Sequence, residues 1–177
     1  AFFGSEREDV AINDTGAVLG DSPHLSRRRD AIHEQRAGNV AAAGYASLAR
    51  GDNDAGVSYA RDVVRQYPQE IAYRRLLVSA LIAQEQYAAA RSEATEALAL
   101  NGNDAPLLAQ RGQMRLRLGD KRGAQQDFSQ ALAVGTLPLR DQASLYAALG
   151  QPKEALARMQ QARAKGLLKP GDEVQIA

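Results

Sequence analysis

A small set of residue types returns along this chain at an interval of 34 residues. Blocks that start at Ala37, Ile71, Ala105 and Thr136 are separated by 34, 34 and 31 residues. Within these blocks the fifteenth position holds Gly51, Glu85, Gly119 and Gly150, and the twentieth holds Gly56, Ala90, Ala124 and Ala155. The next two matching positions hold Ala60, Ala94, Phe128 and Met159, and then Val63, Ala97, Ala131 and Ala162. A period of this length indicates a repeat protein, in which each unit buries its apolar face only by stacking on its neighbours.

Each block reads as two helices divided by a turn. In the first block Val40, Gly44 and Leu48 recur at helical spacing, Gly51–Asp54 breaks the pattern, and a second apolar stripe runs from Val57 to Pro68. The other blocks repeat this scheme, and the third is three residues shorter. The pattern therefore predicts four helix pairs, over residues 37–70, 71–104, 105–135 and 136–169.

The two ends of the chain differ from these blocks. Residues 1–36 do not follow the frame and are rich in turn formers, so we expect an irregular leader, in which Ser22 and Pro23 begin a short helix. At the other end Pro170–Glu173 has the character of a first helical turn. Residues 170–177 are thus predicted to start a fifth pair, and the chain to be a fragment of a longer protein.

Composition narrows the classes of function. A formal net charge of +1 gives no global attraction for nucleic acid, and the only basic run, Arg27–Arg29, is short. The chain contains no cysteine, which excludes disulfides and thiolate sites and is compatible with either redox compartment. No apolar run is long enough to cross a bilayer, so we expect no direct membrane insertion of this segment.

Over residues 37–177 the chain resembles the tetratricopeptide-repeat (TPR) family. The third block carries the pattern best, with Leu108, Gly112, Gly119, Ala124, Phe128 and Ala131. Four positions depart from the family pattern: Gly56 stands where alanine is usual, Arg74 and Arg115 where large apolar or aromatic residues are usual, and Val78 where a small one is usual. The resemblance implies an all-α, right-handed superhelical solenoid of TPR-like helix pairs, whose first helices line a concave groove that commonly takes peptides. An ordinary alanine-rich helical bundle is the alternative.

The resemblance also implies where a ligand would bind. The groove positions of the first helices hold Tyr45, Arg75, Ser79, Gln110, Gln113, Arg117, Arg140 and Ser144. Three arginines among them favour an acidic segment or a terminal carboxylate, because a guanidinium can bind a carboxylate through two parallel hydrogen bonds. The alternative interpretation is that these arginines are solvated surface charges. The Lys and Asn clamp by which some relatives bind an acidic chaperone tail is absent.

A narrower resemblance concerns Gram-negative envelope proteins. The runs Tyr73–Val78, Ala109–Gly112 and Leu116–Gly119 are similar to repeat regions that precede an outer-membrane barrel in phage-adsorption receptors and exopolysaccharide exporters. This likeness implies a periplasmic arm that gathers proteins or a polysaccharide. A cytoplasmic location is the alternative.

The sequence offers no catalytic or metal-binding constellation. His24 and His33 lie nine residues apart, which does not match the spacing of paired zinc ligands on a helix. Asp52–Asp54 imitates a calcium loop, but Val57 and Val63 stand where Gly and Glu are required, so we interpret it as a helix cap. Glu6, Glu8 and Asp9 have no apolar frame around them that could separate their pKa values. We therefore expect neither a cofactor nor a metal, and no nucleic-acid partner.

Two hypotheses about function follow. The first is a non-catalytic scaffold that binds a peptide segment or a polymer on its concave face. The second is an accessory repeat region of an envelope enzyme, receptor or exporter whose functional domain lies beyond Ala177. The sequence following Ala177 would distinguish them.

Overall fold

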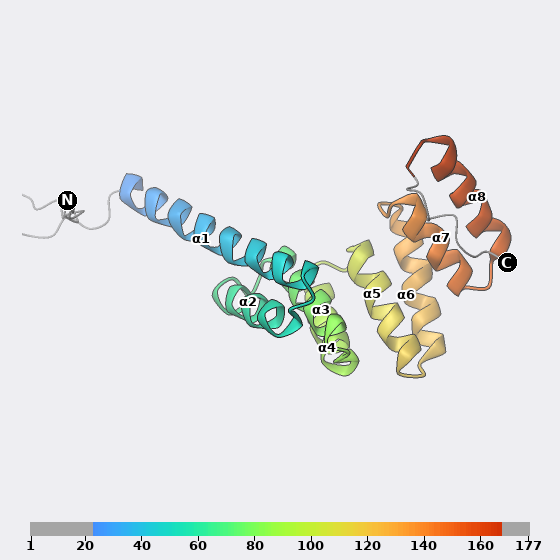
Figure 1. Ribbon diagram of the computed structural model, residues 1–177, viewed down its shortest axis with the longest axis horizontal. Helices are drawn as coiled ribbons and strands as arrows, with labels where there is room; N and C mark the ends of the chain where they lie inside the picture. The colour runs from blue at the N-terminus through green and yellow to red at the C-terminus, as the bar shows by residue number, and fades with distance from the viewer. Residues whose placement is uncertain (1–22, 168–177) are drawn as a thin grey trace, which may run out of the picture. The chain divides into compact units, whose positions relative to one another are not determined.

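The computed structural model describes residues 23–167 and divides the chain into two units that meet between Asn39 and Val40. Among the described residues there are eight α-helices and no strand (Figure 1). Their bounds are α1 Pro23–Ala49, α2 Asn53–Gln66, α3 Ile71–Ala83, α4 Tyr87–Leu100, α5 Ala105–Arg117, α6 Lys121–Val134, α7 Leu139–Ala148 and α8 Pro152–Ala164. The all-α fold class expected from the sequence is confirmed. The predicted fifth pair, at residues 170–177, lies outside the described residues.

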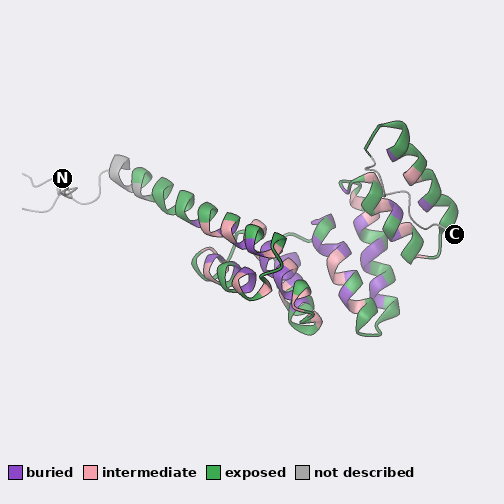
Figure 2. Cartoon of the chain, in the orientation of Figure 1, coloured by how far each residue is buried: buried purple, intermediate pink, exposed green. Residues whose placement is uncertain are grey.

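Helix α1 is a single element of 27 residues. The short helix expected at Pro23 and the first helix of the first block are both parts of it. Its N-terminal part, over residues 27–36, is exposed at every residue whose burial is described (Figure 2). Four of these ten residues are arginine, and Ala31, Glu34 and Gln35 are also good helix formers, which favour a helix without needing burial. Helical structure there therefore needs no apolar repeat pattern.

The recurring glycine position marks the turn inside each pair. Gly51, Gly119 and Gly150 all have positive φ, at 79°, 86° and 71°, and Glu85 in the same column has φ 59°. Glycine adopts this left-handed conformation without steric cost, which explains its recurrence at these helix ends. The second block adopts the same backbone with a larger residue.

Small residues allow the helices of a pair to cross closely. A methyl group on Gly112 of α5 would lie 2.5 Å from Cε1 of Phe128 on α6, and one on Gly56 of α2 would lie 2.5 Å from Cδ2 of Leu48. The alanines of the same columns, Ala60, Ala90, Ala94, Ala97 and Ala131, are fully buried. Figure 2 shows the buried residues on the facing sides of the helices.

Successive pairs stack on one another from α2 to α6. Helices α2 and α3, and again α4 and α5, pack side by side, as do α3 with α4 and α5 with α6. Contact between α6 and α7 is sparse by comparison. This junction is where the block is three residues short, and it holds Gly135 at φ 74° and the buried Leu137. Helices α7 and α8 pack on each other as a hairpin.

Two departures from the TPR pattern are explained by ion pairs between helices of one pair. Arg74 of α3 pairs with Glu93 and, at 3.4 Å, with Glu96, both on α4. Arg115 of α5 lies 3.0 Å from Asp127 of α6. Both arginines are mostly buried and replace an apolar contact by a charged one.

Asp127 is the centre of the larger ionic cluster. Arg111 donates two hydrogen bonds to its carboxylate, at 2.9 and 2.7 Å, and Arg115 supplies a second guanidinium. Only 3% of the Asp127 side chain is exposed. The carboxylate is thus saturated by arginines, which is the arrangement that makes a buried charge tolerable.

Candidate functional site

The eight groove residues expected from the sequence lie on the first helices of the pairs. The structure places Tyr45 on α1, Arg75 and Ser79 on α3, Gln110, Gln113 and Arg117 on α5, and Arg140 and Ser144 on α7. Ser79 and Gln110 are half-buried, Arg75 keeps 41% of its side chain exposed, and the other five residues are exposed. Most of them are therefore accessible to a partner.

Helices α3 and α5 are joined at this face by polar contacts. The Gln110 amide nitrogen donates to Ser79 Oγ at 3.1 Å. One turn before Ser79, Arg75 Nε lies 3.8 Å from Oδ2 of Asp104, whose other oxygen caps α5 by accepting from the Leu107 amide. The structure thus brings Arg75, Ser79 and Gln110 together on neighbouring first helices. Asp104 belongs to this group and was not expected from the groove positions, although its place before a predicted helix signalled a cap.

Two polar atoms of this group lack a hydrogen-bond partner. Within residues 23–167, Arg75 Nε and Gln110 Oε1 are the side-chain atoms that are shielded from solvent and unpaired. An unsatisfied buried donor or acceptor costs about 1–3 kcal/mol. Native proteins keep few such atoms, so each calls for an explanation. Here one atom, Arg75 Nε, is a donor and the other, Gln110 Oε1, is an acceptor, and both side chains lie on the face formed by α3 and α5.

Arg117 is directed to the edge of this face. Its guanidinium carbon lies 5.0 Å from the ring centroid of Tyr87, the first residue of α4. A guanidinium at this distance over a tyrosine ring is attracted by the electron-rich face. The contact holds Arg117 near the α3–α4 turn.

Arg140 and Ser144 lie on α7, beyond the sparse α6–α7 contact. Ser144 Oγ donates to the carbonyl oxygen of Arg140 at 3.2 Å, within the helix. Tyr45, at 51% exposure, is a large exposed aromatic residue on α1. The predicted set is therefore spread over four helices, and its best-connected part is the α3–α5 group.

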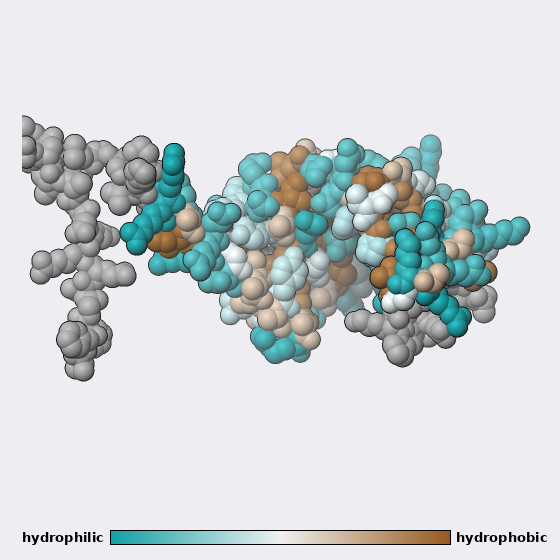
Figure 3. All heavy atoms as spheres, turned by 90° about the horizontal axis from the view of Figure 1, so that it is seen from above, coloured by the Kyte–Doolittle hydropathy of each residue, from teal (hydrophilic) through white to brown (hydrophobic). Residues whose placement is uncertain are grey.

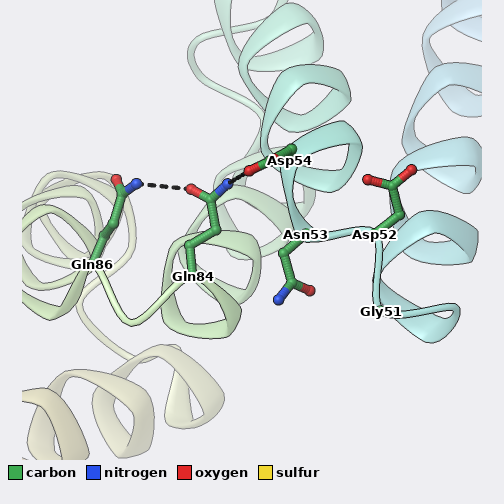
Figure 4. Close-up of a pocket in the computed structure, with 6 residues that line it drawn as sticks. All are labelled: Gly51, Asp52, Asn53, Asp54, Gln84 and Gln86. Carbon is green, nitrogen blue, oxygen red and sulfur yellow. Dashed lines mark hydrogen bonds between the residues drawn. The ribbon is translucent and has the colours of Figure 1, made fainter.

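A separate open pocket of about 490 Å³ lies between the α1–α2 and α3–α4 turns (Figure 4). Its lining residues are Gly51, Asp52, Asn53, Asp54, Gln84 and Gln86. Asp52 caps α2 by accepting from the Ala55 amide at 3.1 Å, as the sequence indicated.

The described residues contain no group of three or more His, Cys, Asp or Glu that could hold a metal ion. None of the helices in the described part is long and apolar enough to cross a membrane.

Solved structures with the same fold are TPR proteins. A TPR protein of Thermus thermophilus matches at a TM-score of 0.63, with 24% identity over 78% of each chain. The Sgt2 TPR domain of Aspergillus fumigatus matches at 0.59, with 17% identity over 80% of this chain and 90% of that one. The first TPR domain of Spaghetti (RPAP3), bound to the HSP90 peptide SRMEEVD, matches at 0.59, with 21% identity over 70% and 94%. No family model matches the chain, and no curated protein matches it.

The chain therefore has the TPR solenoid fold, as the repeat frame predicted. At these identities the likeness shows the fold alone. The names of these structures mention neither phage adsorption nor polysaccharide export, so the envelope role and the periplasmic location stay predictions.

Proposed function

We propose that this chain is a non-catalytic scaffold that binds an extended peptide segment across the first helices α1, α3 and α5. The observation that carries the proposal is the pair of unpartnered polar atoms, Arg75 Nε and Gln110 Oε1, on a face that is otherwise accessible. A peptide backbone offers a carbonyl acceptor and an amide donor at every residue. It can therefore supply the hydrogen bonds that these two side chains lack once they reorient toward it.

The charges of the face favour a segment that carries a carboxylate beside the Arg75 position. The carboxylate nearest Arg75 is Asp104, at 3.8 Å, which is beyond hydrogen-bond distance and is already engaged in capping α5. A carboxylate from a partner can approach the exposed part of this guanidinium more closely and form charge-assisted hydrogen bonds. Binding of an HSP90 peptide by the TPR domains of Spaghetti supports peptide binding on this fold, although the sequence of this chain lacks the chaperone-tail clamp.

The test is selection of short random peptides displayed in a library, followed by fluorescence anisotropy with the purified chain. Changing Arg75→Ala and Gln110→Ala together should weaken binding of the selected peptides at least about tenfold, since loss of two polar contacts to a ligand corresponds to roughly 1.4 kcal/mol or more.

The matched control changes a polar pair on the second helices. Arg61 and Gln125 are exposed, on α2 and α6 respectively. The double change Arg61→Ala and Gln125→Ala should leave the affinity unchanged. Equal loss of binding in both double variants, or none in either, would reject the assignment of the peptide to the first helices.

A further inference from the structure

The side-chain polar atoms of the open pocket that have no hydrogen-bond partner among the described residues are all oxygens. Asn53 Nδ2 donates to the Ala83 carbonyl oxygen at 2.8 Å. Gln84 Nε2 donates to Asp54 Oδ1 at 2.6 Å, and Gln86 Nε2 to Gln84 Oε1 at 2.8 Å (Figure 4). Each side-chain amide nitrogen thus donates one of its two N–H groups to an oxygen of the protein itself. Asp52 Oδ2, Asp54 Oδ2, Asn53 Oδ1 and Gln86 Oε1 accept from no described residue. The pocket is therefore suited to a cationic side chain.

The charge around this pocket agrees with that preference. Neither Asp52 nor Asp54 has an ion pair within residues 23–167, and the exposed Glu85 adds a third carboxylate at the neighbouring turn. Arg50 is the nearest cation in sequence, and its guanidinium donates to Ser47 Oγ at 3.2 Å.

The turn of the next pair carries the opposite charge. Arg117, Lys121 and Arg122 are exposed around the α5–α6 turn, and none of the three has a carboxylate partner among the described residues. The two nearby acids are engaged elsewhere, since Asp120 caps α6 at the Gly123 amide and Asp127 is bound by Arg111 and Arg115. Lys121 and Arg122 also stand in the first turn of α6, where the helix dipole disfavours cations. This turn therefore holds unpaired positive charge at a cost to helix stability.

The acidic pocket and the basic turn lie on one edge of the stack. The Gln84–Asp54 hydrogen bond joins the α1–α2 turn to the α3–α4 turn. The contact of Arg117 with Tyr87 joins the α3–α4 turn to the α5–α6 turn. Three successive turns thus form a row, with negative charge at one end and positive charge at the other.

We propose that this edge is a self-association surface, at which the basic turn of one copy fills the acidic pocket of a second copy. Because both surfaces lie on the same edge, a two-fold axis near the α3–α4 turn lets each copy present its Lys121 and Arg122 to the other's Asp52 and Asp54. The association closes as a dimer and satisfies both ends at once. The proposal does not depend on peptide binding by the first helices.

A contact made of turn residues falls at the low end of interface sizes, and its energy is mainly electrostatic. The dimer should therefore be reversible and should dissociate as ionic strength rises, because salt screens exposed charges. An acidic segment of another protein, or a nucleic acid, would compete for the basic turn without needing the pocket.

The experiment is sedimentation equilibrium of the full chain at low and high salt, with charge-swapped variants. The variant Lys121→Glu/Arg122→Glu has two acidic surfaces, and Asp54→Lys/Glu85→Lys has two basic ones. Each should be monomeric alone, and an equimolar mixture of the two should form a heterodimer. The first variant should also be at least as heat-stable as the unchanged chain, since acids suit the first turn of α6. Its loss of association then cannot be ascribed to unfolding.

A matched control moves the same charge change to the end of α8. Arg163→Glu/Lys165→Glu alters two exposed cations away from these turns and should leave the dimer intact. A chain that stays monomeric at low salt and high concentration would overturn the proposal. So would a dimer that survives Lys121→Glu/Arg122→Glu, or capture of an acidic peptide or an oligonucleotide by a chain that does not self-associate.

Discussion

Gly112 shows how one residue fixes the spacing of a helix pair. The position facing it is filled by the ring of Phe128, which is 1% exposed and the largest fully buried side chain among the described residues. Because the ring is enclosed, it cannot move aside to make room for a methyl group at position 112. The end of a flexible surface side chain could do so. The absence of a side chain at Gly112 is therefore a packing requirement of the α5–α6 pair.

We predict that Gly112→Ala lowers the free energy of unfolding by up to roughly 2 kcal/mol, the overpacking penalty less the gain in helix propensity. The measurement is urea unfolding followed by circular dichroism. The control is Gly38→Ala in α1, where an added methyl group meets no atom within 4 Å. That change should raise stability by up to about 1 kcal/mol through helix propensity alone. Equal effects of the two substitutions would show that the contact with Phe128 is not limiting.

Asp127 carries the other residue-scale prediction. Asp127→Asn leaves Arg111 and Arg115 without their shared carboxylate and should cost about 3 kcal/mol, the low end for a broken buried pair because both arginines are partly exposed. The same urea titration with Asp62→Asn provides the comparison, since Asp62 pairs with Arg65 at the surface and its loss should cost less than about 1 kcal/mol. A small effect at Asp127 would mean that solvent reaches this cluster.

The partners of the buried arginines could not be predicted from the sequence. The repeat frame marked Arg74 and Arg115 as departures but could not name Glu93 or Asp127 as their partners. Those partners depend on how far each second helix is rotated about its axis, which a spacing pattern leaves open. The turn glycines and buried alanines could be predicted because the backbone conformation of the turn and the close approach of the helix backbones require small residues at those positions.

At the scale of elements, the α7–α8 hairpin differs from the pairs before it. Its junction with α6 is sparse, and neither helix begins with a side-chain cap hydrogen bond. The buried residues of these two helices are Ala143, Leu145, Ala155 and Ala162, which bury little apolar area. A repeat protein is stabilised mainly by the contacts between neighbouring units, so this hairpin is held less firmly than α3, α4 and α5.

We predict that amide hydrogens of α7 and α8 exchange through local opening, at a lower free energy than those of α3 to α5. Hydrogen exchange followed by mass spectrometry gives the protection of each helix. Protection of α7 and α8 equal to that of α3 to α5 would contradict the weak junction. The sequence did signal this site, because the third block is three residues short, but a deletion alone does not say whether the following pair remains tightly stacked.

For the whole molecule, the repeat frame predicted the solenoid and the succession of its turns, because period and turn chemistry are properties of the chain itself. The groove residues were placed on the first helices by position in the frame. Their grouping was not predictable, since the Ser79–Gln110 and Arg75–Asp104 contacts join α3 to α5 and to the residue that caps α5, which depends on how successive pairs stack. Figure 3 shows a mostly hydrophilic surface with separate hydrophobic patches. On the face in view, no single large apolar surface indicates where a partner would bind.

The central claim is that the first helices bind a peptide, and amide chemical-shift mapping with a library-selected peptide tests it most directly. Titration should shift the resonances of α3 and α5 around Arg75, Ser79 and Gln110, with Tyr45 of α1 at the margin. Resonances of the second helices α2, α4 and α6 should change little. Shifts centred on the second helices, or spread evenly over the chain, would contradict the account.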